Sequence, residues 1–467
     1  MLSLWKGIFQ LTRFLKRLSG TQRLTFSFLI VILIGSILLS LPITHYQNAP
    51  ATGYLDHLFT VVSMVCVTGL SVFPVADVYN GLGQVIAVIL MQIGGLGLVT
   101  LLAVSTYILR KRMNLSEQHI LQSALSYDNS GHLKRYLFNV YKITFIIESL
   151  IAALFLIDFI PRFGVGHGIF NAIFLAVSAF CNAGFDNLGG DSLKPFVLNP
   201  LLNLLFMVLI ISGGIGFAVW VDIKRAIKQF FADRPYRFKT FTRQLSNQTR
   251  LVLATTAVLL LLGTVLTWLI EANNPKTIGQ YNPFQQFMVS LFQTVTMRTA
   301  GFATISYLDT HPATNILYMI QMIIGGAPGG TAGGVKVTTV AITFLLFKSE
   351  LAGQTEVTFR HRIIPNRVIK QTLTVLIFFF SVLIVGYVLL LQLEPHHDPL
   401  ALLFEAVSAI ATVGVSMDLT PQLSTGGRLI IMAMMFIGRV GPLTVLLSLL
   451  QKKEKDIQYA QTNITVG

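Results

Sequence analysis

Eight long runs of apolar residues alternate with more polar segments along the chain. Each run reaches the length of about 20 residues that a helix needs to cross the hydrocarbon core of a bilayer. Such runs are too frequent for a soluble domain, and they predict an all-α protein with eight full transmembrane helices. The predicted spans are residues 25–43, 82–109, 137–160, 200–222, 250–271, 314–347, 369–393 and 428–450.

A shorter apolar stretch lies between the two members of each successive pair of spans. At 11 to 16 residues, these stretches are too short to cross the membrane as helices. The last two begin with Asn-Pro and Asp-Pro, which is a helix-start signal. Each stretch is therefore either an amphipathic helix on the surface or a re-entrant pore helix. The four stretches are residues 56–66, 168–181, 282–297 and 398–411.

Every short stretch ends at a glycine, and these glycines recur with one period. The motifs CVTGLS, CNAGFD, RTAGFA and ATVGVS place them at Gly69, Gly184, Gly301 and Gly414, which are 115, 117 and 113 residues apart. Three copies carry Phe ten and Ser six positions before the glycine, whereas Phe292 of the third copy is nine before it. This periodicity indicates internal duplication. Each copy holds an even number of spans, so the copies are parallel and can surround one axis, which favours pore helices.

A second glycine cluster follows about 24–29 residues after each of these glycines. In the first two copies it reads GGLG (94–97) and GGIG (213–216), which fits close packing of membrane helices. In the third copy it expands to GGAPGGTAGGVK (325–336). Six glycines and a proline would cost a continuous helix on the order of 9 kcal/mol. The apolar arms on either side reach only roughly 14 and 16 Å, so the segment between them is expected to form a loop near mid-membrane.

Basic residues gather in five segments that alternate with weakly charged connections. These segments hold 26 of the 34 lysines and arginines, which is the positive-inside pattern of a cell-membrane protein. The net charge of +14 therefore reports topology and not a nucleic-acid partner, and we expect both termini and three long connections in the cytoplasm. No polar stretch is long enough for a soluble core, which argues against ATPase or kinase chemistry. The segments are 1–23, 110–136, 222–250, 348–370 and 451–467.

The four glycine turns are candidates for a cation-selective filter. Irregular backbone survives in a membrane only where protein or water surrounds it. A pore helix that ends halfway through the bilayer points carbonyl groups, and the negative end of its dipole, at the axis. Four such ends would form a ring of oxygens that replaces the hydration shell of a cation. The candidate filter residues are Val67, Thr68, Gly69, Asn182, Ala183, Gly184, Thr299, Ala300, Gly301, Thr412, Val413 and Gly414.

Through the motifs VTGLSV, CNAGFDNLG, RTAGFAT, GGAPGGTAGGVK and GRVGPLT, the chain resembles the Trk/Ktr/HKT superfamily of potassium transporters over essentially its whole length. Within it, the chain looks most like the KtrB-type membrane subunits of bacterial Ktr systems. The resemblance implies four fused span–pore-helix–span units, potassium passing one glycine per unit, a homodimer, and a gating ring of cytosolic nucleotide-binding KTN (RCK) subunits. In plant relatives a serine at the first filter glycine goes with sodium conduction, so Gly69 favours potassium.

The glycine-rich segment of the third copy is the candidate gate. We expect it on the cytoplasmic side of the carbonyl ring, where a flexible backbone can block the ion path, as the resemblance also implies. Arg439 replaces the second glycine of the fourth cluster and is expected to donate hydrogen bonds to loop carbonyls; the alternative is an ion pair with Asp222 or Glu148. Lys336 either shares this role or points to the cytoplasm. The gate residues are Gly325, Gly326, Pro328, Gly329, Gly330, Gly333, Gly334, Lys336 and Arg439.

Other polar residues have weaker assignments. Arg298, three residues before Gly301, is expected to pair with Glu405 behind the filter. Asp186 either faces the outer mouth or caps a turn. The gate segment is not a nucleotide-binding P-loop, because that motif needs glycine before its lysine and Ser or Thr after it. The remaining assignments are interfacial positions for His57, His167, His396 and His397, and packing positions for Cys66 and Cys181.

The sequence thus predicts a channel-like potassium subunit with transported potassium, or also sodium, as its ion and no organic cofactor. A sodium-coupled secondary transporter and a less selective sodium/potassium channel stay open as alternatives. An intramembrane enzyme is disfavoured, because the chain lacks paired carboxylates, a metal set or a serine–lysine dyad in the spans. The predicted division is 1–24 N-terminus, 25–109 repeat 1, 110–222 repeat 2, 223–347 repeat 3, 348–450 repeat 4 and 451–467 C-terminal tail.

Overall fold

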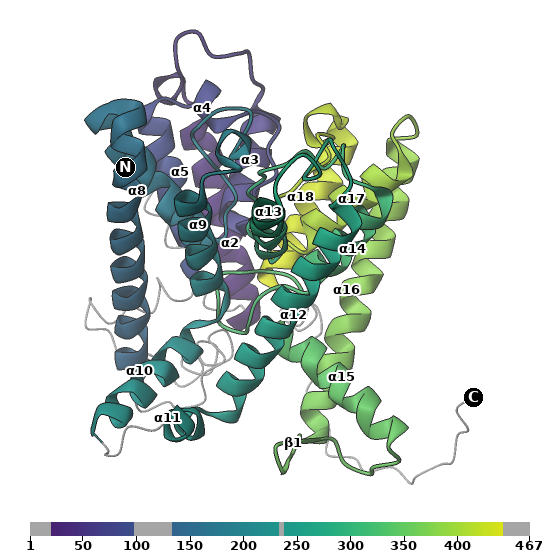
Figure 1. Cartoon of the computed structure of the whole chain (residues 1–467). Coiled ribbons are helices and arrows are strands. Elements are labelled where there is room, and N and C mark those ends of the chain that lie inside the picture. Colours follow the sequence, from purple (N-terminus) through teal and green to yellow (C-terminus); the bar gives the residue numbers. More distant parts are fainter. Residues whose placement is uncertain (1–19, 98–132, 233–237, 442–467) are drawn as a thin grey trace, which may run out of the picture.

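The computed structural model of this chain describes residues 20–97, 133–232 and 238–441. Its long helices stand side by side, with short helices and loops at one end and α10 (Phe217–Ala232) and α11 (Phe238–Gln244) at the other (Figure 1). Predicted features on residues 1–19, 98–132, 233–237 and 442–467, including the basic termini, lie outside the described residues.

Within the described residues, three helices are long and apolar enough to cross a membrane, or four if the bent pair α9–α10 counts as one span. The far ends of the predicted spans 82–109 and 428–450 lie outside the described residues, so the arrangement of eight spans stays a prediction. The three long helices are α8 (Leu133–Cys181), α12 (Asn247–Glu271) and α16 (Asn366–Leu393), and shorter helices in predicted spans are α2 (Gly20–Leu39), α5 (Gly81–Leu96) and α18 (Thr425–Val440).

The four short apolar stretches are helical and lie among the longer helices. Three of them are separate helices: α3 (Tyr54–Cys66), α13 (Pro283–Thr296) and α17 (Pro399–Ile410). The fourth is the C-terminal part of α8, where the predicted span and short stretch are joined through Gly164, whose φ of 77° and ψ of 171° are not helical. Glycine adopts this conformation without the steric cost that a side chain would add.

The Asn-Pro and Asp-Pro signals begin helices as the sequence predicts. The side chain of Asn282 accepts a hydrogen bond from the Gln285 N–H at 2.9 Å, at the start of α13. The side chain of Asp398 accepts one from the Ala401 N–H at 3.0 Å, at the start of α17. These caps pair N–H groups that have no partner within the helix.

The centre of the molecule is built around the four short helical stretches. The phenylalanines nine or ten positions before the repeat glycines are at most 1% exposed: Phe59, Phe174, Phe292 and Phe404. By contrast, leucines and isoleucines on the long helices, such as Ile377 at 68%, are exposed on the outside of the bundle. Lipid tails are as apolar as leucine, so apolar side chains can face the bilayer while the closely packed short helices occupy the interior.

The prediction of one continuous span at 200–222 is wrong. Helix α9 (Pro200–Gly214) ends at the GGIG motif, and α10 leaves it at an angle of 98°. Gly216 has a φ of 89°, which a helix cannot accommodate. The indole N–H of Trp220 donates to the Ser212 carbonyl at 2.8 Å across the bend. These glycines therefore break a helix, and Gly213 also packs closely as predicted, since a Cβ atom there would overlap the Phe180 carbonyl oxygen of α8.

The predicted span 314–347 is interrupted where the sequence predicts. Helix α14 (Pro312–Ile323) and helix α15 (Val337–Leu351) flank the glycine-rich loop. The ends of the loop are held together, because the Gly325 N–H donates to the Val335 carbonyl at 2.9 Å and the Val335 N–H donates to the Ile323 carbonyl at 2.9 Å. Backbone pairing of this kind satisfies polar groups that the missing helical turns leave free.

The remaining described elements are short. The strands β1 and β2 pair in an antiparallel hairpin, with Thr358 opposite Ile363, at the same end of the molecule as α10 and α11 (Figure 1). These elements are η1 (Pro42–Thr44), α4 (Val75–Val78), η3 (Lys194–Phe196), β1 (Thr358–Phe359), β2 (Arg362–Ile363) and η4 (Thr420–Gln422).

A buried carboxylate ties the end of α12 to the start of α14. Glu271 is 0% exposed. Its oxygens accept hydrogen bonds from the Asn274 side chain at 2.7 Å, from the Thr277 hydroxyl at 2.6 Å and from the His311 N–H at 2.8 Å. The hydroxyl of Thr314 donates to it as well. The carboxylate therefore organises the outer connection of the third repeat.

We predict that Glu271→Ala destabilises the protein by about 3 kcal/mol or more, because each buried donor left unpaired costs about 1–3 kcal/mol. The measurement is the thermal unfolding midpoint of the purified protein in detergent. Glu350→Ala is the control, since Glu350 is exposed near the end of α15. Equal midpoints for the two variants would contradict the role given to Glu271.

Candidate functional site

The four repeat glycines, 115, 117 and 113 residues apart in the chain, meet in space. A Cβ atom placed on Gly184 would lie 2.8 Å from the Cα of Gly301 and 3.1 Å from the Cα of Gly69. One placed on Gly414 would lie 2.7 Å from the Cα of Gly69. All four have positive φ, between 72° and 105°. Only glycine fits where backbones come this close and take this conformation.

The residue two positions before each glycine has left-handed backbone geometry. The φ values are 55° at Val67, 57° at Asn182, 66° at Thr299 and 51° at Thr412. This conformation ends a pore helix and redirects the chain. It is strained for β-branched residues, and such strain persists only where the surrounding structure imposes it. Sequence analysis missed this feature, since only the asparagine is a residue type that favours positive φ.

Hydroxyl side chains tie each glycine turn to its own helix. Ser63 accepts from the Gly69 N–H at 3.0 Å, and Ser408 accepts from the Gly414 N–H at 3.1 Å. Ser178 accepts from the Phe185 N–H at 3.1 Å. In the third repeat, the hydroxyl of Thr296 donates to the Phe302 carbonyl at 2.7 Å. The repeated serine thus has a positioning role, and a threonine one place nearer the glycine fills it in the third repeat.

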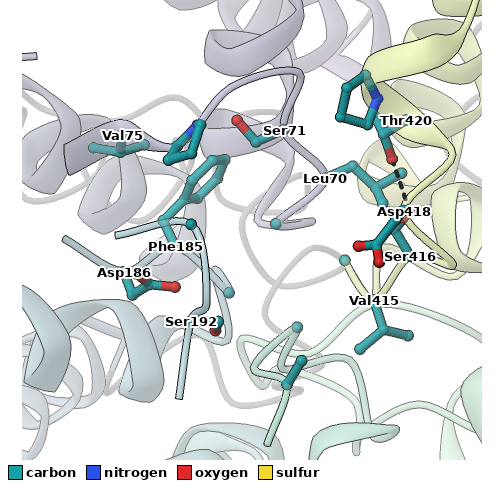
Figure 2. A pocket seen from close by; sticks show the side chains of 18 of the residues that line it. Leu70, Ser71, Val75, Phe185, Asp186, Ser192, Val415, Ser416, Asp418 and Thr420 are labelled. Atoms are coloured by element: carbon teal, nitrogen blue, oxygen red, sulfur yellow. Dashed lines mark hydrogen bonds between the residues drawn. The ribbon is translucent and has the colours of Figure 1, made fainter. Parts of the chain in front are cut away.

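A cavity of about 410 Å³ opens on one side of the glycine turns and is lined by all four of them. Figure 2 shows Leu70, Phe185, Val415 and other residues that follow the glycines around this space. Asp186, Lys194 and Asp418 are the charged residues of the lining. The cavity is therefore a vestibule at the mouth of the glycine turns, with a mixed lining that includes three charged side chains.

Asp186 combines both alternatives that the sequence leaves open. It lines the vestibule (Figure 2), as the sequence allows. Its carboxylate also accepts a hydrogen bond from the Leu188 N–H at 3.1 Å. Burial raises the pKa of its carboxyl group to about 6, against the hydrogen bonds that stabilise the charged form. The side chain is thus charged at neutral pH and neutral in mild acid.

On the other side, the glycine-rich loop packs against the ends of the pore helices. The Gly333 N–H donates to the Thr299 hydroxyl at 3.0 Å, and the Thr331 hydroxyl donates to the Phe180 carbonyl at 3.1 Å. A Cβ atom on Gly333 would lie 2.9 Å from the Ala411 carbonyl oxygen. The loop therefore contacts the second, third and fourth repeats directly behind the glycine turns.

The bend between α9 and α10 forms the seat of this loop. The Ala327 N–H donates to the Gly214 carbonyl at 2.8 Å, and the Thr331 N–H donates to the Gly213 carbonyl at 3.1 Å. In return, the Phe217 N–H donates to the Gly329 carbonyl at 3.1 Å. The broken helix of the second repeat exposes the backbone groups that the loop needs. Sequence analysis missed this contact, although the recurrence of the glycine clusters was a signal for it.

Arg439 on α18 bridges the loop and α5. Its guanidinium donates to the Thr331 carbonyl of the loop, as predicted, and also to the carbonyls of Gly94 and Gly95, the latter at 3.2 Å. The alternative ion pairs are wrong: Asp222 pairs with Arg225, and Glu148 accepts a hydrogen bond from Gln92 at 3.4 Å. Five guanidinium N–H groups let one arginine pair several free carbonyls at a chain break.

Lys336 forms a hydrogen bond within the glycine-rich loop. Its ammonium donates to the Ala332 carbonyl at 2.7 Å, four residues earlier in the loop. Of the two predicted alternatives, the structure therefore favours a bond to a loop carbonyl over a side chain that points away. Both cations of the candidate gate contact backbone oxygens of the loop.

The predicted pair between Arg298 and Glu405 is wrong. Glu405 faces the turn of its own repeat, where it accepts from the Thr420 hydroxyl at 3.0 Å and from the Ser416 hydroxyl. Arg298 donates to the Thr256 hydroxyl of α12 at 3.4 Å. Glu405 leaves α17 and Arg298 leaves the turn after α13, toward different neighbours, which their positions along the sequence do not reveal.

The histidines and cysteines show no metal chemistry within the described part of the chain, where no cluster of three or more potential ligands occurs. His57 is buried and bonded to the Tyr79 hydroxyl at 2.9 Å, so it packs inside the protein, and its interfacial depth stays a prediction. His167 and His396 are exposed, and His397 lies 3.8 Å from Glu394. Both cysteines are buried and free, which fits packing positions.

Comparison with known proteins assigns the family. The family described as "TrkH: Cation transport protein" matches residues 11–458. The "Potassium/sodium uptake protein NtpJ" of Enterococcus hirae is 36% identical over 97% of this chain and 98% of that protein. The "Ktr system potassium uptake protein B" of Bacillus subtilis is 33% identical over 97% of each chain.

A solved structure supports the fold. The crystal structure of the potassium transporter TrkH from Vibrio parahaemolyticus aligns with a TM-score of 0.72, covering 92% of this chain and 85% of that chain at 18% identity. The chain belongs to the TrkH family of cation transport proteins.

Proposed function

We propose that this protein carries potassium ions across the cell membrane as the ion-conducting subunit of a Ktr-type uptake system. The observation that carries the proposal is the meeting of Gly69, Gly184, Gly301 and Gly414 between the vestibule and a glycine-rich loop. Relatives that match nearly the whole chain are named as potassium uptake proteins, which supports the choice of ion.

Backbone carbonyls of the glycine turns would select the ion. Oxygens of the twelve filter residues replace water around a dehydrated cation, and the C-terminal dipoles of the pore helices add negative potential. The side chains around the four glycines differ between repeats, which is compatible with coordination by the main chain. Potassium is the transported ion, and the mechanism requires no organic cofactor on this chain.

The loop at 325–336 would act as the gate. It lies against the ends of the pore helices, and its bonds to Arg439 and to the bend at 213–216 hold one conformation. Ion flow requires the loop to leave this position. Each hydrogen bond from a charged group contributes about 1.5–3 kcal/mol, so a few such bonds can shift the balance between closed and open states strongly.

A homodimer and a cytosolic ring of nucleotide-binding KTN (RCK) subunits would complete the system. The names of the Bacillus subtilis and Vibrio alginolyticus relatives, each a protein of a Ktr system, support a partner subunit. Helices α10 and α11 and the hairpin β1–β2 lie at one end of the molecule (Figure 1), and they belong to connections that the positive-inside pattern assigns to the cytoplasm. This face is the proposed docking surface for the ring.

A sodium-coupled or less selective mode of transport is the second candidate. It is favoured by one observation, the name "Potassium/sodium uptake protein" of the relative from Enterococcus hirae. Rubidium uptake into proteoliposomes with and without sodium separates the two modes, since only the coupled mode requires sodium for uptake.

We predict that Gly184→Ala reduces rubidium uptake into proteoliposomes at least about 10-fold, because the new Cβ would lie 2.8 Å from the Ala300 carbonyl oxygen and the φ of 72° disfavours a side chain. Gly81→Ala is the matched control, since a Cβ there meets nothing within 4 Å. Normal rubidium uptake by Gly184→Ala at normal expression would contradict the proposed filter.

Arg439→Ala is predicted to raise basal rubidium flux in the absence of the cytosolic partner by about 10-fold, because loss of its bonds to the loop weakens the closed state by the energy of a charged hydrogen bond. The matched control is Arg367→Ala, which removes an exposed arginine at the start of α16. Unchanged flux in Arg439→Ala, and also in a deletion within 325–336, would contradict a gate at this position.

Asp186 is predicted to make uptake sensitive to the external pH. At potassium concentrations below saturation, uptake falls a few-fold as the pH drops from 7 to 5, because the carboxylate loses its charge near its pKa of about 6 and attracts cations less. Asp77 lies near it, and Lys194 and Asp418 share the vestibule. Asp186→Asn should show low uptake and a flat profile over this range, while Asp418→Asn keeps the fall. If uptake by Asp186→Asn still fell between pH 7 and pH 5, the pH dependence would belong to another titratable group.

A further inference from the structure

A small crevice reaches the back of the third glycine turn from the outside of the bundle. It lies between α12 and α14 and has a volume of about 140 Å³. Its walls are mainly leucine and isoleucine side chains, and at its rim Leu262 and Ile320 are 56% and 53% exposed. This part of the surface faces the bilayer if α12 is a membrane span, so the crevice opens to lipid.

A buried arginine ends this crevice. Arg298 is only 5% exposed and lines the cavity three residues before Gly301. Its Nε atom is buried without a hydrogen-bond partner, and its one side-chain bond is the contact of 3.4 Å with Thr256. No carboxylate among the described residues forms an ion pair with it. A guanidinium in this position is costly unless a counter-charge joins it.

A second unpaired polar side chain lines the same crevice from α14. Both the oxygen and the nitrogen of the Gln321 side chain are buried without a hydrogen-bond partner. Together with the Nε of Arg298, two donor groups and one acceptor without partners belong to the two polar side chains that line this mainly apolar space. Buried polar atoms are nearly always paired in proteins, so three unpaired ones in one crevice indicate a ligand.

We propose that this crevice binds the carboxyl end of a single-chain amphiphile, such as a long-chain fatty acid, from the bilayer. A carboxylate matches a guanidinium in charge and geometry and can accept from the Gln321 amide at the same time. The resulting pair is neutral, so its burial costs less than that of the arginine alone. The hydrocarbon chain then lies along the exposed leucines and isoleucines at the rim. A phospholipid headgroup with two chains is too large for the volume of about 140 Å³.

Such a ligand would restrain the third glycine turn. The side-chain amide of Asn182 lies 3.3 Å from the backbone carbonyl oxygen of Arg298, and this contact links the turns of the second and third repeats. A carboxyl group that holds the Arg298 side chain also restrains this link. The site is independent of the proposed ion, since its occupancy can be measured without any flux.

The test is displacement of a fluorescent fatty acid from the purified protein in neutral phosphatidylcholine nanodiscs. Oleate should displace the probe at least 10-fold more potently than oleyl alcohol, which has the same chain without the charge. Arg298→Gln should lower the affinity for oleate at least 10-fold, and Gln321→Leu should lower it less. Leu269→Trp is the control, because Leu269 is 66% exposed on α12 and does not line the crevice.

Leu266→Trp keeps Arg298 and fills the crevice, so it tests the site even if Arg298→Gln fails to fold. This variant should lose the probe while Leu269→Trp retains it. Equal potency of oleate and oleyl alcohol, unchanged binding in Leu266→Trp, or displacement by an anionic phospholipid as potent as that by oleate would each overturn the proposal.

Discussion

Close approach of four main-chain turns is the constraint on which the rest of the structure depends. Where Gly69, Gly184, Gly301 and Gly414 meet, there is no room for a single Cβ atom. Such contact leaves backbone carbonyls as the groups that face one another, in a region where each polar group must have a partner or contact water. The buried phenylalanines, the repeated hydroxyls and the left-handed residue before each turn serve to hold these backbones in place.

The loop behind the turns joins all four repeats. It belongs to the third repeat, rests on the broken helix of the second, contacts the pore-helix end of the fourth, and is linked by Arg439 to α5 of the first. Its bonds are mostly backbone hydrogen bonds between segments that lack helical partners. An element of this kind can exchange one set of partners for another at small cost, which suits a switch better than a packed helix does.

Much of this architecture could be predicted from the sequence because it rests on composition and repetition. The period of the glycines indicated that the four turns are equivalent, and the helix cost of six glycines and Pro328 predicted the break at 325–336. The contact of Arg439 with the loop followed from its place in the repeated cluster. These predictions rest on local sequence features, and their recurrence in four copies makes each feature easier to recognise.

Other features depend on tertiary contacts that one sequence does not contain. The break at Gly214 and Gly216 was missed because two or three glycines cost a helix little, and only the docking of the loop makes the bend favourable. The predicted partner of Arg298 was wrong because the sequence does not show which neighbour the turn after α13 faces. Positive φ at Val67, Thr299 and Thr412 contradicts local propensity, and the surrounding packing imposes it.

The most direct measurement of the central claim is the position of a heavy potassium analogue in the molecule. Crystals of the protein grown with rubidium or thallium, measured at the absorption edge of the ion, should give an anomalous peak on the axis between the four glycine turns, at about 3 Å from backbone oxygens of Thr68, Ala183, Ala300 or Val413. An ordered peak elsewhere, with the space between the four turns free of ions in transport-competent protein, would contradict the account.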